Sequence, residues 1–312
     1  MLLYCYLIIT TQKEIQLDSL YKEYKNWLKD QSIDEKNRFL IDLKQYAEYF
    51  ADLPEGQQLN EISYADDEKR FFHIIENLSI TTAYPLILFI YREVTNENER
   101  KRILKLLESY LVRRNICRLT TKNYNNIFIS IIKKLMKQRD DGERISVDSI
   151  RGILSSFTEE TNRFPDDAEL KAAFKESVLS NQNARELLYL IALYEKMSPL
   201  ADVVKLSSLN YSVEHMMPVK WQANWPIADV DDQKRAARDK ALKTLGNLTL
   251  VTRRLNSKLS NDAWDEKKKT LQKYSSLNIT TDYLDDGIWD ETRIDSRAGD
   301  LAELAVKMWG HL

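Results

Sequence analysis

Glycine and proline are scarce in this chain, with 7 Gly and 6 Pro among 312 residues. Both residues supply the turns that a many-stranded β fold needs between its short strands. So few of them in so long a chain predict long helices with short connections. Hydrophobic residues make up 43% and charged residues 30%, which is typical of a globular protein with a sizeable core and not of a disordered chain.

Apolar residues recur at helical spacing from about Asp18 to Met197, which predicts one helix after another. Residues 85–94 are almost uniformly apolar and predict a helix that is buried on several sides. The clearest stripes are Leu20, Tyr24, Trp27 and Leu28, then Phe39, Leu43, Tyr46 and Phe50, then Ile103, Leu107, Tyr110 and Leu111, and finally Leu187, Leu188, Ile191 and Leu193.

The pattern changes near residue 205. Residues 211–215 alternate like a short strand, which Pro218 would end, and 245–251 read as a turn followed by a second strand. Helices are expected over 231–243, 261–274 and 290–309. We therefore expect a mainly α fold in three parts: a multi-helix domain (1–204), a small α+β unit (205–275) and a C-terminal helical segment (276–312) that packs back on the chain.

Charge is unevenly distributed along a chain whose formal net charge is −2. Residues 205–275 hold 14 Lys and Arg against 8 Asp and Glu, a local excess of +6, and the rest of the chain carries −8. A basic segment inside an acidic chain indicates a polyanionic partner. A solvated helix surface would show the same charge, so this observation leaves both interpretations open.

Cysteines and the N-terminus say little about function. Cys5 and Cys117 are far apart and form no CxxC pair, so neither a disulfide framework nor a cysteine zinc site is expected. The apolar opening run, residues 1–9, is too short to span a bilayer and has no secretory layout. We expect a cytoplasmic protein without membrane contact, and the abrupt apolar start suggests a chain that begins inside a larger ancestral unit.

His215 is the histidine with the most functional promise. His73 lies in an apolar helical stripe and His311 is the penultimate residue, whereas His215 directly follows Glu214 at the end of a predicted strand. Hydrolysis of a phosphodiester needs a base for water, a role that suits histidine, and a cation held by hard oxygen ligands. Adjacent Glu and His occur by chance in many proteins, so the pair gains weight only from the segments that follow it.

Four segments in this order resemble the C-terminal nuclease domain of GmrSD-type restriction endonucleases, which are phage-defence proteins that cut modified DNA. The resemblance implies a divergent HNH, or His-Me finger, module of the ββα-metal type within 205–275, and it extends to the preceding helical region around residues 108–117 and to the closing helix. The segments are Glu214-His215-Met216-Met217-Pro218, Leu245-Gly246-Asn247-Leu248-Thr249-Leu250-Val251, Leu255-Asn256-Ser257-Lys258-Leu259-Ser260-Asn261, and Trp264 with Lys267.

The resemblance also implies roles for individual residues. His215 resembles the general base that activates water, and Glu214 and Asn256 resemble ligands of a divalent metal, Mg²⁺ or Mn²⁺. Asn247 resembles the structural asparagine that braces the loop around the histidine. Strand alternation would send Glu214 and His215 to opposite faces, so both can face one metal only if the strand ends or twists there.

Basic and aromatic residues near these motifs are candidates for DNA contact. Trp221 and Trp225 could stack on bases, whereas core packing is expected for Trp264. A lysine run on a helix is also compatible with a solvated face. The candidates for phosphate contact are Arg253, Arg254, Lys258, Lys267 and Lys268.

We therefore expect a metal-dependent DNA endonuclease subunit or fragment of a GmrSD-like restriction system. The resemblance implies modified phage DNA as the substrate and a nucleotide-hydrolysing sensor domain as a separate or missing partner, because the chain shows no glycine-rich phosphate loop. The alternative is a catalytically inactive module that grips DNA or docks the sensor through its helices.

Overall fold

The computed structural model describes residues 1–197, 204–225, 227, 231–259, 261–285 and 287–312. Across these residues the fold is mainly α with two small sheets, so the expected fold class is confirmed. The helices are α1 (Leu2–Thr11), α2 (Leu20–Lys29), α3 (Ile33–Ala51), α4 (Asp67–Asn77), α5 (Tyr84–Glu93), α6 (Glu97–Ile116), α7 (Tyr124–Asp140), α8 (Val147–Ser155), α9 (Asp167–Glu176), α10 (Asn181–Glu195), α11 (Asp232–Ala241), α12 (Arg253–Leu259), α13 (Trp264–Tyr274), α14 (Asn278–Thr281) and α15 (Glu291–Met308).

Side-chain caps begin many of these helices. Ser32 opens α3 with a capping box closed by Glu35, and Ser180 caps α10. Asp231 and Asp290 accept backbone N–H bonds at the starts of α11 and α15. Each cap satisfies amide groups that the first helical turn leaves without partners, which fixes where the helix begins.

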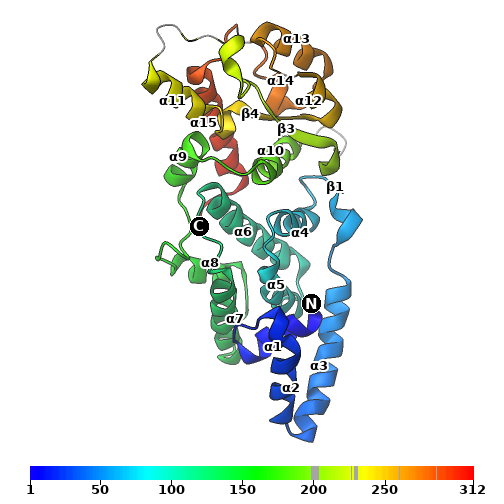
Figure 1. Ribbon diagram of the computed structural model, residues 1–312. Coiled ribbons are helices and arrows are strands. Elements are labelled where there is room, and N and C mark those ends of the chain that lie inside the picture. The colour runs from blue at the N-terminus through cyan, green and yellow to red at the C-terminus, as the bar shows by residue number, and fades with distance from the viewer. Residues whose placement is uncertain (198–203, 226, 228–230, 260, 286) are drawn as a thin grey trace.

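The molecule is elongated, with the hairpin of α2 and α3 at one end and the β3–β4 sheet at the other (Figure 1). Strands β1 (Glu61–Ile62) and β2 (Leu206–Ser207) pair across more than 140 residues of sequence, and β3 (Tyr211–His215) pairs with β4 (Leu248–Thr252). Both pairs are antiparallel. Residues 211–215 were expected as a strand, whereas the short β1–β2 pair was not.

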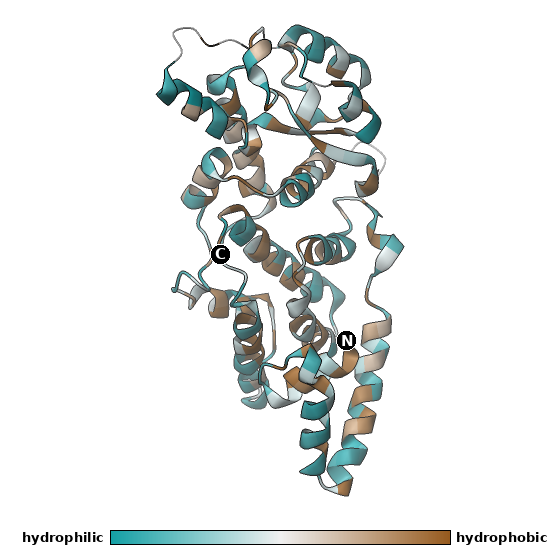
Figure 2. Ribbon diagram, viewed as in Figure 1, coloured by the Kyte–Doolittle hydropathy of each residue, from teal (hydrophilic) through white to brown (hydrophobic). Residues whose placement is uncertain are grey.

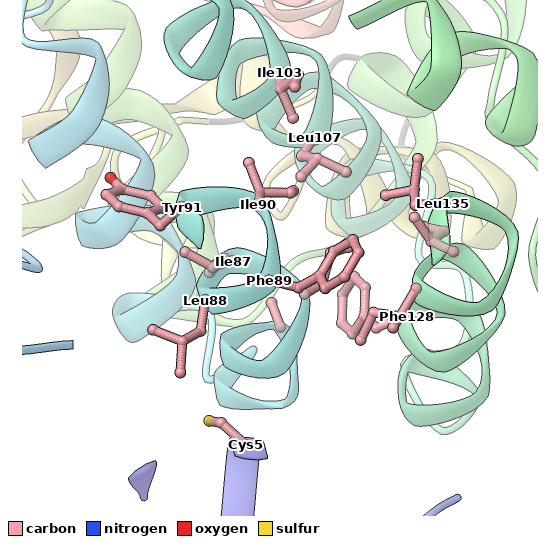
Figure 3. Close-up of a cluster of buried hydrophobic side chains, with 14 of the residues drawn as sticks. Cys5, Ile87, Leu88, Phe89, Ile90, Tyr91, Ile103, Leu107, Phe128 and Leu135 are labelled. Atoms are coloured by element: carbon pink, nitrogen blue, oxygen red, sulfur yellow. The ribbon is translucent and has the colours of Figure 1, made fainter. Parts of the chain in front are cut away.

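The largest core lies among the N-terminal helices, where α5 is buried from Pro85 to Tyr91. Figure 3 shows Phe89 and Ile90 of α5 packed toward Leu107 of α6 and toward Phe128 and Leu135 of α7. Hydrophobic residues concentrate on α1 and α5, while α11 and α13 are largely hydrophilic (Figure 2). None of the described helices is both long enough and apolar enough to cross a membrane.

A second core joins the helical part to the β3–β4 sheet. Leucines of α10 pack with Leu248 and Leu250 of β4 and with Leu301 of α15. In Figure 1, α10 lies on one side of this sheet and α12 and α13 lie on the other. The sheet is therefore held between two helical layers, and its position depends on both.

Helix α15 ties the C-terminus back to the helical part. It packs against α9 and against the short 3-10 turn η6 (Leu245–Asn247). At its end, the Trp309 indole donates to Glu108 Oε1 at 2.9 Å, and Arg113 Nε donates to the Trp309 carbonyl at 2.6 Å. The expected amphipathic helix over 290–309 is confirmed, and Arg113 of α6 is fully buried.

Candidate functional site

The two-stranded β3–β4 sheet holds Glu214 and His215 at the end of β3. Glu214 pairs with Thr249 and His215 with Leu248, and the ladder continues as Met216 N–H donates to the Asn247 carbonyl at 2.9 Å. Because side chains alternate along a strand, His215 shares the α10 face with Leu248, while Glu214 faces α13. The strand is regular up to His215, so the two side chains lie on opposite faces.

Glu214 is buried and forms an ion pair with Lys267 of α13, with 2.5 Å between Oε1 and Nζ. Burial raises the pKa of Glu214, and the charge of Lys267 opposes that rise. Burial likewise lowers the pKa of Lys267 against the pull of Glu214. A charge out of water is costly unless it is paired, so each residue offsets part of the cost of burying the other's charge.

His215 is half-buried, and burial together with the nearby charge of Lys267 lowers its pKa. The imidazole is therefore neutral at pH 7, the state in which a histidine can accept a proton. Its ring has no hydrogen-bond partner within the described part of the chain. The ring is thus chemically available on a strand end whose backbone is fixed by neighbours.

Asn247 fixes the backbone that follows His215. Its side chain is fully buried and accepts from Met217 N–H at 2.8 Å while donating to the Met217 carbonyl at 2.9 Å. The same amide donates to the Leu242 carbonyl at 3.0 Å and accepts from the Trp289 indole at 3.1 Å. All the hydrogen-bonding capacity of this buried amide is used to join the two loops that flank the sheet.

Asn256 and Lys267 cover the free edge of β3. Asn256 Nδ2 donates to the Val213 carbonyl at 2.8 Å and to Ser212 Oγ at 2.9 Å. Lys267 Nζ donates to the His215 carbonyl at 2.6 Å. Carbonyls two residues apart on a strand point the same way, so these two side chains satisfy an edge that β4 leaves unpaired.

Four of the five expected phosphate contacts lie within reach of solvent. Arg253, Arg254 and Lys258 are exposed, and Lys268 is half-buried. Lys267 is 1% exposed and bound to Glu214, so its ammonium is not available to a phosphate at the surface. The sequence did not reveal this, because Lys267 stands in a run of three lysines that a helix distributes over different faces.

The three tryptophans of this region are core residues. Trp221, Trp225 and Trp264 are at most 7% exposed and pack in one cluster with Trp289. The idea that Trp221 and Trp225 stack on bases is therefore wrong for this structure, because their faces are covered by protein. The expected core packing of Trp264 is confirmed.

Trp289 and Arg297 support the backbone around Asn247, and the sequence did not predict this role for either residue. Arg297 is fully buried, and Nη1 donates to the carbonyls of Gly246 and Leu248 at 2.8 Å each, on both sides of Asn247. A usable signal was present: Arg297 falls three residues after Ile294 and four before Leu301, on the apolar side of its helix. An arginine there predicts a buried guanidinium that binds backbone carbonyls.

Metal-binding capacity at this site is modest. Within the described ranges, no three His, Cys, Asp or Glu side chains gather into a metal-binding group. Glu214 is already paired with the Lys267 ammonium, which would compete with a metal ion for this carboxylate. A carboxylate with an amide oxygen and water suits Mg²⁺, which keeps several waters when it binds protein.

Comparison with known proteins covers the C-terminal half of the chain. Residues 164–304 match the family model described as the C-terminal domain of GmrSD restriction endonucleases. The matched span runs from just before α9 to within α15 and contains Glu214, His215, Asn247 and Asn256. No curated protein matches the chain significantly.

Proposed function

We propose that this chain, whose residues 164–304 resemble the C-terminal domain of GmrSD restriction endonucleases, is a metal-dependent DNA endonuclease subunit or fragment of a GmrSD-like phage-defence system. The family indicates a nuclease that acts on DNA. The HNH type of the site, modified phage DNA as the preferred substrate and a nucleotide-hydrolysing sensor as a partner in the cytoplasm are finer parts of the proposal. So is the division into domains at residues 204 and 275.

The observation that carries the proposal is the setting of His215. Its neutral, unpartnered imidazole stands at the last residue of β3, and the loop directly after it is held by the buried Asn247 amide. A base must be held in place to take a proton efficiently, and misplacement by about 1 Å can cost a hundredfold in rate. His215 would take the proton of the attacking water as that water adds to phosphorus, while the bond from phosphorus to the leaving oxygen breaks and that oxygen takes a proton from solvent.

Glu214 and Asn256 would hold a divalent cation, Mg²⁺ or Mn²⁺, through their side-chain oxygens. Because β3 is regular up to His215, the Glu214 carboxylate lies on the face of the strand opposite to the His215 ring. Such a cation, when bound, neutralises charge on the phosphate and on the leaving oxygen. Arg253, Arg254, Lys258 and Lys268 would hold the DNA backbone, which gives affinity without sequence information. Lys267 has a different role, because its ammonium is paired with the buried Glu214 carboxylate.

The Glu214–Lys267 ion pair also favours a second candidate function. An ammonium that already satisfies Glu214 competes with a metal, as expected of a module that grips DNA or docks a partner without cutting. This candidate predicts DNA binding without metal-dependent cleavage, so one experiment separates the two.

The experiment is nicking of supercoiled plasmid DNA by the full chain in Mg²⁺ or Mn²⁺, with EDTA as the blank. Wild type should nick, and His215→Ala should lose about 10²- to 10⁴-fold in rate, the usual contribution of a general base. His311→Ala is the matched control, since it removes an exposed histidine far from β3 in sequence. Equal nicking by wild type and His215→Ala would overturn the nuclease proposal, and plasmid binding without nicking would favour the second candidate.

A further inference from the structure

A cavity of about 410 Å³ opens beside β3, between the first turns of α10 and the start of α12. Asn181, Gln182 and Arg185 line it from α10, and β3 contributes residues 211–213. Arg253 closes the remaining side. None of the described residues that line it is acidic, so the cavity presents guanidinium, amide and hydroxyl groups.

Both arginines of the cavity lack an anionic partner. Arg185 is half-buried and Arg253 is exposed, and neither forms an ion pair or a side-chain hydrogen bond with any residue that the structure describes. Most arginines buried elsewhere in the protein are paired or bind several carbonyls, as Arg70, Arg113 and Arg238 do. Two unpaired guanidinium groups around one polar cavity form a site for an anion, and their forked donors match phosphate oxygens.

The cavity and His215 lie on the same strand. Val213 lines the cavity, and His215 lies two residues further on the same face of β3, roughly 6.6 Å away at ~3.3 Å per residue. Ser212, which also lines the cavity, accepts a hydrogen bond from Asn256, so the cavity and the proposed site share β3.

We propose that Arg185 and Arg253 hold a backbone phosphate of the DNA strand next to the one that is cut. This inference rests on the proposed function, because it takes the scissile phosphate to lie at His215. It adds Arg185, which stands on α10 outside the 205–275 unit, to the DNA-binding surface. The contact would fix the register of the strand and would be indifferent to base sequence.

The test measures binding of a short fluorescent DNA duplex to the full chain in EDTA, over a KCl series from about 50 to 200 mM. The double variant Arg185→Ala/Arg253→Ala should bind roughly tenfold to a hundredfold more weakly at low salt. Its plot of log affinity against log salt should be shallower by about 0.9, the contribution of one phosphate. Arg38→Ala removes an exposed arginine on α3, at the far end of the molecule in Figure 1, and should bind like wild type.

The outcomes separate this inference from the nuclease proposal. If wild type nicks plasmid in a His215-dependent way while the double variant keeps wild-type affinity and salt slope, the phosphate subsite is wrong and the nuclease proposal stands. If inorganic phosphate raises the melting temperature of wild type but not of the double variant, and DNA affinity is unchanged, the cavity holds free phosphate and the DNA subsite is overturned. Arg185→Lys/Arg253→Lys should keep the salt dependence of DNA binding and lose part of the affinity. The positive charge remains in lysine, but the forked donors of the guanidinium are lost.

Discussion

Glu214 and Lys267 are joined as a buried ion pair between β3 and α13, with 2.5 Å separating Oε1 from Nζ and side-chain exposures of 11% and 0%. The same ammonium donates to the His215 carbonyl, so one lysine contacts both consecutive residues of the proposed site. The pair therefore links the stability of this region to the geometry on which the proposed chemistry depends.

Lys267→Met should strongly destabilise the protein, because it leaves the Glu214 carboxylate buried without a partner. Removing one member of a buried pair costs about 3–5 kcal/mol, measured here as the free energy of unfolding in urea. The double variant Glu214→Gln/Lys267→Met should lose less than the sum of the two single variants. Lys269→Met, which breaks a surface pair with Glu266, is the control and should change stability by less than about 1 kcal/mol. A Lys267→Met variant as stable as that control would contradict a buried ionised pair.

Asn247→Asp should damage the site with little change in side-chain size. A carboxylate cannot donate to the carbonyls of Met217 and Leu242, and each buried group left unsatisfied costs about 1–3 kcal/mol. We expect a lower melting temperature and a fall in kcat with KM nearly unchanged, because the loop after His215 loosens. Asn224→Asp, whose amide makes one exposed bond to the Asn261 carbonyl, is the control. An Asn247→Asp variant with the wild-type melting temperature and kcat would show that this amide does not hold the loop in place.

Gly246→Ala tests how closely η6 approaches α15. A methyl group at Gly246 would lie 2.1 Å from the Ile294 carbonyl oxygen, a backbone atom that cannot move without shifting the helix. Overpacking of this kind costs typically 1–3 kcal/mol or more, visible as a lower urea midpoint. Gly152→Ala, inside α8 with open space around it, should instead stabilise the protein by about 0.5–1 kcal/mol. The prediction fails if both alanines shift the midpoint in the same direction.

His73 should make stability depend on pH. Burial alone would lower its pKa, but the hydrogen bond and charge of Glu186, 2.6 Å away, together with the Leu59 carbonyl, raise it above 6.5. A raised folded pKa gives stability that is complete below the unfolded pKa and is lost as pH rises through the folded value. The free energy of unfolding of wild type minus that of His73→Gln should therefore shrink from about pH 6 upward. A difference that stays constant from pH 6 to pH 9 would mean that His73 is not charged in the folded protein.

The strands and most helices near the site could be predicted from the sequence, because alternation and helical spacing are local signals. Residues 211–215 and 231–241 match their expected elements closely. The pairing of Ile62 with Leu206 could not be predicted, because two-residue strands carry no period of their own. The role of Lys267 was also beyond local reasoning, since burial of a lysine depends on which carboxylate the fold brings to it.

The roles of the site residues remain predictions. Their surroundings explain which of these roles the sequence could indicate and which it could not. Motif order indicated Asn247 as a structural residue, and the buried amide has the contacts that such a role needs. Arg185 gave no signal, because it stands on α10 in a sequence otherwise typical of a core helix. Its position beside β3 follows from the packing of α10 on the sheet.

Trp289 and Arg297, which bind Asn247 and the carbonyls on both sides of it, stand beyond residue 275. A polypeptide trimmed to residues 205–275 would keep Glu214, His215, Asn247 and Asn256 and lose the two side chains that immobilise Asn247 and its neighbours. Attempts to transplant this segment into another protein should therefore also include Trp289 and α15. The smallest segment that can be moved to another protein is therefore set by the residues that support the motifs and not by the motifs alone.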